Sequence, residues 1–399
     1  MSPFINKKRL LTYPILVLIA LSSVTLFNVI FADGWYGRIG GFIGYDFLSI
    51  YAGGKLYWTE TSDLYNLETM ANLQSQLAGI PRSGLNFFPN PPYAALIYGL
   101  FSFLPYSSAF VIWTILSVVC LVISTWLIHR YLIPKNLSDN GLTLVYLLVL
   151  IFSFYPIIFG LQNGQNHSFS LFLAAMIIIF SIKERPGLAG VCAGFMIYKP
   201  QLVLGWVILW LLLKNYKTLL SFLLTGIAWV GVSLLHKGLS PYLDYLRYIP
   251  HLDNITYQTW EVTPVAMINK LCMDIFGTTN NTILFLLAVI VYTVVMFWIV
   301  RRYPSSRHPA PMILVLLFPL FNIHFMFYDL ALIIPLFFLW SQISQSRIVL
   351  VTAVSIYLAV LILPAVSEAI KFPIMGFLPL LILLAVISDQ KNSFKICQN

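Results

Sequence analysis

Charged side chains are scarce in this chain. Asp, Glu, Lys and Arg make up 9% of its 399 residues, whereas hydrophobic residues make up 59%. A soluble fold carries about 25% charged residues to solvate its surface. The composition therefore excludes a soluble globular protein and predicts a membrane protein that crosses the bilayer several times.

Cysteine is also scarce. The four cysteines are Cys120, Cys192, Cys272 and Cys397, and two of them lie within apolar segments. Their spacing matches neither a metal-binding motif nor a disulfide framework. We therefore expect no zinc site and no disulfide scaffold.

Internal repeats and low-complexity runs are absent from the sequence. The lack of repeats weighs against a transporter, because the two halves of many transporters echo each other. The net charge of +9 does not indicate a nucleic-acid surface, because Lys and Arg cluster at the ends of apolar segments. We expect membrane lipids, and no nucleic acid, as partners.

Long apolar segments recur from end to end. The first, Leu10 to Ala32, follows Lys7-Lys8-Arg9 and lacks a clear cleavage site, so we interpret it as a retained signal anchor. The positive-inside rule places these basic residues in the cytoplasm and residues 33–86 outside the cell.

Thirteen apolar segments can be counted. The basic clusters between them can all lie in the cytoplasm only if one segment, most simply residues 91–104, is re-entrant or kinked. The sequence thus predicts an all-α polytopic protein of about twelve transmembrane helices, with both termini inside. Residues 33–86 and 236–280 form two larger external loops, and residues 1–399 form a single membrane domain. Within the first loop, residues 62–79 are expected to form an amphipathic helix.

Several short motifs follow one another in a recognisable order. They are Asp46-Phe47 with Tyr51 and Leu56, Asp63-Leu64-Tyr65, Phe88-Pro89 with Pro91-Pro92, Gly164-Gln165-Asn166, Ala189-Gly190 leading to Lys199-Pro200, and Tyr328-Asp329-Leu330. In this order and membrane context, the chain resembles the family 87 glycosyltransferases.

The resemblance implies an integral membrane enzyme of the GT-C type that takes a sugar, in the best-known members mannose, from a polyprenyl-phosphate donor. It implies a lipid or glycan acceptor, an active site on the external or periplasmic side of the inner (plasma) membrane, and no cofactor. A divalent metal is not indicated, because the acids form no compact ligand set. Gly53-Gly54 and Phe88-Pro89-Asn90 depart from the family pattern, which leaves the donor sugar open.

Asp46 is the candidate catalytic residue. It lies among aromatic residues shortly after the first apolar segment. Glycosyl transfer from a lipid phosphate requires that the acceptor hydroxyl lose its proton, and a carboxylate can act as the general base. The resembled family uses the acid of its first external loop in this way. The alternative is that Asp46 only caps a helix near the membrane.

The departing lipid phosphate requires positive charge near it. Lys199, between two short apolar segments, is the first candidate, and Arg82 is the second. A lysine whose ammonium group extends to the interface and an arginine in a solvated loop are the respective alternatives.

Two further groups are candidate substrate-binding residues. Gln165 and Asn166 lie in an amide-rich turn that could hold sugar hydroxyls, or could be an ordinary polar turn. His324, Tyr328 and Asp329 lie within an apolar run, where we expect His324 and Tyr328 on one helical face. A purely structural His–Asp pair is the alternative for this second group.

Two other functions fit a membrane protein with these features. A lipid-linked sugar transporter or flippase would need no carboxylate base. A polymerase or ligase of lipid-linked glycans would need a diphosphate-linked oligosaccharide as donor.

Overall fold

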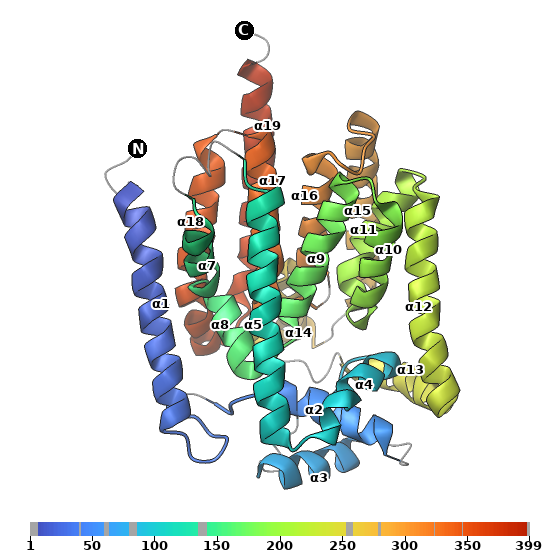
Figure 1. The fold of residues 1–399 in the computed structure, drawn as a ribbon. Helices are drawn as coiled ribbons and strands as arrows, with labels where there is room; N and C mark the ends of the chain where they lie inside the picture. The colour runs from blue at the N-terminus through green and yellow to red at the C-terminus, as the bar shows by residue number, and fades with distance from the viewer. Residues whose placement is uncertain are drawn as a thin grey trace. The chain divides into compact units, whose positions relative to one another are not determined.

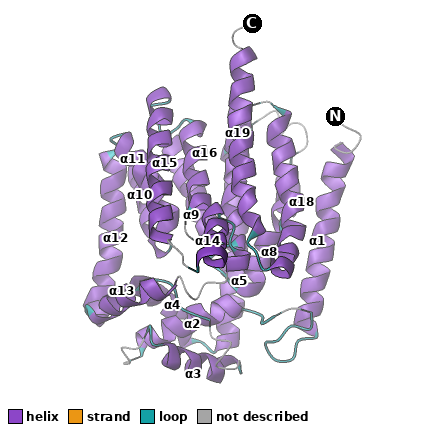
Figure 2. Cartoon of the chain, turned by 180° about the vertical axis from the view of Figure 1, so that it is seen from behind, coloured by secondary structure: helices purple, strands orange, loops and turns teal. Residues whose placement is uncertain are grey.

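The computed structural model describes residues 7–39, 41–59, 64–79, 86–134, 142–252, 258–277, 281–322, 324–344 and 346–396. Within these ranges the secondary structure is helical, apart from isolated bridges such as the one between Glu261 and Met326. The expected all-α class is confirmed (Figure 2).

Among the residues that the structure describes, five helices are long and apolar enough to cross a membrane. They are α1 (Lys7–Ile30, of which Thr12–Ile30 qualifies), α5 (Tyr106–Tyr131), α12 (Tyr216–Lys237), α15 (Asn281–Arg302, of which Ile283–Arg302 qualifies) and α18 (Arg347–Ile370). A sixth candidate is the pair α7 (Leu144–Phe152) and α8 (Tyr155–Asn163), which bends by 63° at its break. These helices indicate a membrane-embedded protein. The total of twelve spans stays a prediction.

The remaining α-helices are shorter. They are α2 (Tyr45–Trp58), α3 (Leu67–Ala78), α4 (Pro92–Tyr98), α9 (His167–Ile182), α10 (Pro186–Phe195), α11 (Pro200–Leu212), α13 (Ser240–Leu252), α14 (Pro264–Phe276), α16 (Pro309–Leu317), α17 (Ile333–Ile343) and α19 (Phe377–Ile396). Short 3-10 helices are η2 (Gly99–Phe103), η3 (Met196–Tyr198), η4 (Gln258–Trp260), η5 (Phe318–Phe321), η6 (Phe327–Leu332) and η7 (Ile374–Gly376).

The chain forms two compact units, each built from three separate stretches of sequence. The first comprises residues 1–123, 148–169 and 224–256, and the second comprises residues 124–147, 170–223 and 257–399. The single membrane domain expected from the sequence stays a prediction.

In the first unit, α2 packs against α3, α4 and η2 (Figure 1). Gly44 precedes α2 with a φ of 73°, a left-handed conformation that glycine adopts without steric cost. Within the first external loop, the sequence predicted a helix at residues 62–79, and α3 lies within that range. Helix α2 was not predicted, because its apolar residues surround the helix and give no one-sided pattern.

In the second unit, α16 and η5 are followed by η6 and α17, so the apolar run that carries His324 is divided between separate short helices. Pro319 has no backbone N–H to donate to the carbonyl of Val315, so it cannot continue the hydrogen bonding of α16. His324 therefore lies on non-helical backbone, and the prediction that it shares a helical face with Tyr328 is wrong.

Candidate active site

Asp46 lies in the first turn of α2 and is half-buried. The Asn86 side chain donates a hydrogen bond from Nδ2 to Asp46 Oδ1 at 3.1 Å, and from the same Nδ2 to the carbonyl oxygen of Tyr45 at 2.9 Å. Gln74 fixes Asn86 in turn, because its amide donates to the Asn86 carbonyl at 2.6 Å and accepts from the Asn86 N–H at 3.0 Å. The buried Gln74 thus holds the backbone of Asn86, and the side-chain amide of Asn86 orients the carboxylate of Asp46.

Asp46 is not the N-cap residue of α2, because Gly44 occupies that position and makes no side-chain cap hydrogen bond. A carboxylate in the first helical turn is favoured by the helix dipole. The alternative that Asp46 caps the helix is therefore wrong, because Asp46 lies inside the first turn and not at the N-cap position. Its role as a base stays a prediction.

A cluster of aromatic rings lies in the same unit. The ring of Tyr65 lies 5.3 Å from that of Tyr245 and 5.2 Å from that of Tyr248, between ring centroids. The Tyr65 hydroxyl donates to the carbonyl oxygen of Asn90 at 2.7 Å, and burial raises the pKa of this phenol well above its ordinary value. These rings join α13 to the segment before α3, a contact that no local sequence pattern indicates.

Gln165 and Asn166 lie between α8 and α9. The backbone N–H of Asn166 donates to Gln165 Oε1 at 3.1 Å, and Asn166 Nδ2 donates to the hydroxyl of Tyr98 at 2.9 Å. Asn166 is buried, so these bonds help to pack this turn. Sugar binding by this pair stays a prediction.

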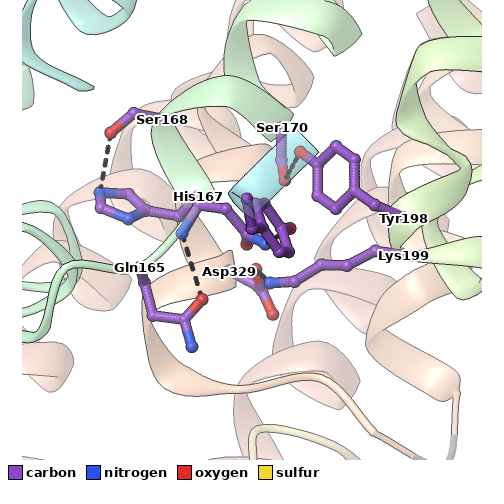
Figure 3. A network of polar contacts seen from close by, with 9 residues as sticks. Gln165, His167, Ser168, Ser170, Tyr198, Lys199 and Asp329 are labelled. Atoms are coloured by element: carbon purple, nitrogen blue, oxygen red, sulfur yellow. Dashed lines mark hydrogen bonds and ion pairs between the residues drawn. The ribbon is translucent and has the colours of Figure 1, made fainter. Parts of the chain in front are cut away.

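Lys199 and Asp329 form an ion pair in the second unit. The Lys199 side chain points toward Asp329 (Figure 3). Its Nζ lies 2.7 Å from Asp329 Oδ1, and the two side chains expose 11% and 3% of their surface. The ammonium also lies 5.0 Å from the centroid of the Tyr328 ring, within the range of a cation–π interaction. Lys199 is held in place because α11 begins at the residue that follows it.

His324 pairs with Glu261, not with the neighbouring Asp329. Its Nδ1 lies 2.9 Å from Glu261 Oε1, and the side chains expose 38% and 5% of their surface. Partial desolvation lowers the pKa of His324, but the hydrogen bond and charge of Glu261 and the charge of Asp329 outweigh it, so the pKa is raised above its ordinary value.

The backbone also holds Glu261 beside His324. Glu261 forms an isolated bridge with Met326, and the Val262 N–H donates to the Phe325 carbonyl at 2.9 Å. No local pattern in the sequence singles out Glu261, because its partner lies 63 residues away in the chain.

Of the residues expected in the site, Lys199, Tyr328 and Asp329 contact one another, and the charges of Lys199 and Asp329 act on His324. Arg82 lies outside the described residues. Where the structure describes the chain, no three His, Cys, Asp or Glu residues are grouped to hold a metal ion. The expectation that the protein needs no metal stays a prediction.

Apolar helices of spanning length, a carboxylate at a helix start and ion-paired cations in an apolar setting define an integral membrane protein with features of an enzyme. The model of glycosyltransferase family 87 matches residues 88–327, more than half of the chain, so the chain belongs to glycosyltransferase family 87. It is a glycosyltransferase. The match begins after Asp46. The chain gave no match among curated proteins or among solved structures.

Proposed function

We propose that this glycosyltransferase moves a hexose, most simply mannose, from a polyprenyl-phosphate donor to a lipid or glycan acceptor. The observation that carries the proposal is the half-buried carboxylate of Asp46, oriented by Asn86 in the first turn of α2. Such a carboxylate can take a proton from a hydroxyl, as the chemistry requires.

The proposed reaction is one displacement at the anomeric carbon. The acceptor oxygen forms a bond to this carbon while its proton passes to Asp46. The bond between the anomeric carbon and the phosphate oxygen breaks, and its electron pair stays on the phosphate. The products are the glycosylated acceptor and polyprenyl phosphate.

The leaving phosphate is proposed to bind ion-paired cations. Lys199 supplies an ammonium, Asp329 and Tyr328 hold it, and His324 adds a ring that can carry a second positive charge. Gln165, Asn166 and Arg82 are proposed as secondary contacts to substrate, as the sequence suggested. Neither a cofactor nor a divalent metal is assigned to the reaction.

The external face of the inner (plasma) membrane is the proposed site of transfer. It follows from the basic residues at the amino end of α1, which the positive-inside rule keeps in the cytoplasm. A GT-C architecture with about twelve spans is part of the same proposal. Support for it comes from membership of family 87 and from the number of apolar helices.

The test is a donor comparison with purified protein in liposomes. Polyprenyl-phosphate mannose, a nucleotide sugar and a diphosphate-linked oligosaccharide are supplied separately with a mixture of membrane glycolipid acceptors, with and without a chelator. We expect a product from the first donor alone, with and without the chelator. A product only from the diphosphate-linked donor would indicate a polymerase or ligase, and transbilayer movement of labelled lipid without product would indicate a flippase.

A further inference from the structure

We propose that Glu261 is a positioning residue of the donor site, which holds His324 so that its protonated ring and the ammonium of Lys199 bind the donor phosphate together. This inference rests on the proposed function, because it takes a polyprenyl-phosphate sugar as the donor. It adds a residue that the sequence did not single out and makes donor binding depend on pH.

The hydrogen bond to Glu261 fixes which ring nitrogen can meet a ligand. A carboxylate only accepts hydrogen bonds, so His324 Nδ1 must carry the proton that it donates to Glu261 Oε1. In the neutral ring, Nε2 is then an acceptor and repels a phosphate oxygen. When the ring gains a second proton, Nε2 becomes a charged donor, which phosphate oxygens bind well.

The burial of the four charged groups supports the same arrangement. The carboxylates of Glu261 and Asp329 expose 5% and 3% of their side chains, whereas His324 exposes 38% and Lys199 exposes 11%. The ring of His324 is therefore the most accessible of the four groups, and both carboxylates are buried.

The charges of the cluster explain why protonation matters. With a neutral His324, one positive charge on Lys199 faces two negative charges on Asp329 and Glu261, and the cluster is net negative. Protonation of His324 makes it neutral overall, with both positive charges on the more exposed side chains. In this form the charged Nε2–H of His324 and the ammonium of Lys199 can hold the donor anion together.

The groups that act on His324 are Glu261, Asp329 and Lys199. Desolvation and the charge of Lys199 lower the pKa of the ring, while Glu261 and Asp329 raise it by more, so the pKa lies above its ordinary value. Donor affinity should accordingly be full at pH values below this pKa and fall as the pH rises through it. Without the charge of Glu261 the pKa falls, so affinity is lost at a lower pH.

The probe is the monomethyl ester of a polyprenyl phosphate. This diester carries one negative charge, as the sugar-linked donor does. It has no second ionisation, so its own charge does not change across the pH range that is measured. Its dissociation constant is measured from pH 5.5 to 9 with purified full-length protein in detergent, with the uncharged polyprenol as the control ligand.

We expect the wild-type dissociation constant to rise with pH through the inflection, because the protonated form binds the anion more tightly. The Glu261→Gln variant keeps a hydrogen-bond acceptor and removes the charge. We expect its inflection to move to lower pH, because the charge that stabilises the protonated ring is removed. The His324→Lys variant, with a cation across this range, should bind with little pH dependence.

The matched control is Glu368→Gln. Glu368 accepts a hydrogen bond from Thr259 at 2.6 Å, two residues before Glu261, and is not among the charged groups that shift the pKa of His324. This variant tests whether loosening the segment before Glu261 is enough to change the pH dependence of binding. We expect Glu368→Gln to keep the wild-type pH profile. An unchanged profile in Glu261→Gln, or an equal shift in Glu368→Gln, would overturn the inference.

The proposed function can fail separately. If the diester binds at no pH and polyprenyl-phosphate mannose yields no product, the donor assignment is wrong and the inference falls with it. If mannose is transferred but the donor KM does not depend on the protonation of His324, only the inference is overturned.

Discussion

Asn86 donates a hydrogen bond to the carboxylate of Asp46 across 40 residues of sequence, at 3.1 Å. The backbone of Asn86 is itself held at both its N–H and its C=O by Gln74, whose side chain is fully buried. The orientation of the proposed base is therefore decided by α3, the helix that carries Gln74. This dependence leads to two predictions, one for the base and one for its support.

The Asp46→Asn change keeps the size of the side chain and removes its ability to accept a proton. We expect turnover to fall about 10²- to 10⁴-fold at normal expression, the usual contribution of a general base. The measurement is product formed per enzyme under saturating donor, with Asp33→Asn as the control because Asp33 is exposed in the same stretch of chain. A variant that retains more than about a tenth of wild-type turnover would remove the base role from Asp46.

The Gln74→Leu change removes both hydrogen bonds to the Asn86 backbone without emptying the buried site. We expect turnover to fall roughly 10- to 100-fold, because small misplacements of a catalytic group are costly. The control is Gln76→Leu, on the exposed side of the same helix. Equal activities of the two variants would show that Asn86 does not need this support.

The Lys199–Asp329 pair gives a stability prediction. Removing either partner leaves the other charge buried, which costs about 3–5 kcal/mol, whereas removing both avoids this penalty. Lys199→Met and Asp329→Leu should each lower the free energy of unfolding more than the double variant does. Thermal unfolding in detergent measures this coupling, and additive effects would contradict a buried pair.

Lys199→Met should also raise the donor KM more than the acceptor KM.

Gly54 gives a prediction about the packing of α2. A Cβ added at Gly54 would lie 2.5 Å from the backbone nitrogen of Gly99, and backbone cannot move aside as a side chain can. Gly54→Ala should therefore lower the free energy of unfolding by about 1–3 kcal/mol. Gly231→Ala is the matched control, because a Cβ there meets no atom within 4 Å and should be neutral or stabilising by up to about 1 kcal/mol. Similar melting temperatures for the two variants would contradict the close approach.

Topology can be tested with fused reporters. A reporter after Gly79 should be external, and reporters after Lys217 or Arg302 should be cytoplasmic, because the basic residues stay inside. Enzymatic activity of a periplasmic reporter and fluorescence of a cytoplasmic reporter distinguish the two sides. A cytoplasmic Gly79 would reverse the proposed location of the transfer reaction.

Composition and apolar segment length were enough to predict a helical membrane protein, because the bilayer imposes the same constraint on every spanning segment. Motif order was enough to indicate the family, which the family model confirms. The sequence also singled out Lys199, His324, Tyr328 and Asp329, because polar groups stand out in apolar surroundings.

The partners of these residues were decided by the tertiary structure alone. Lys199 pairs with Asp329 across 130 residues, and His324 pairs with Glu261 across 63. A structural pair between His324 and Asp329 was the alternative weighed from the sequence, but His324 lies on non-helical backbone between η5 and η6 and pairs with Glu261. Apolar periodicity describes one helix at a time, whereas an ion pair depends on which helices and loops pack together, and that is set by contacts distant in sequence.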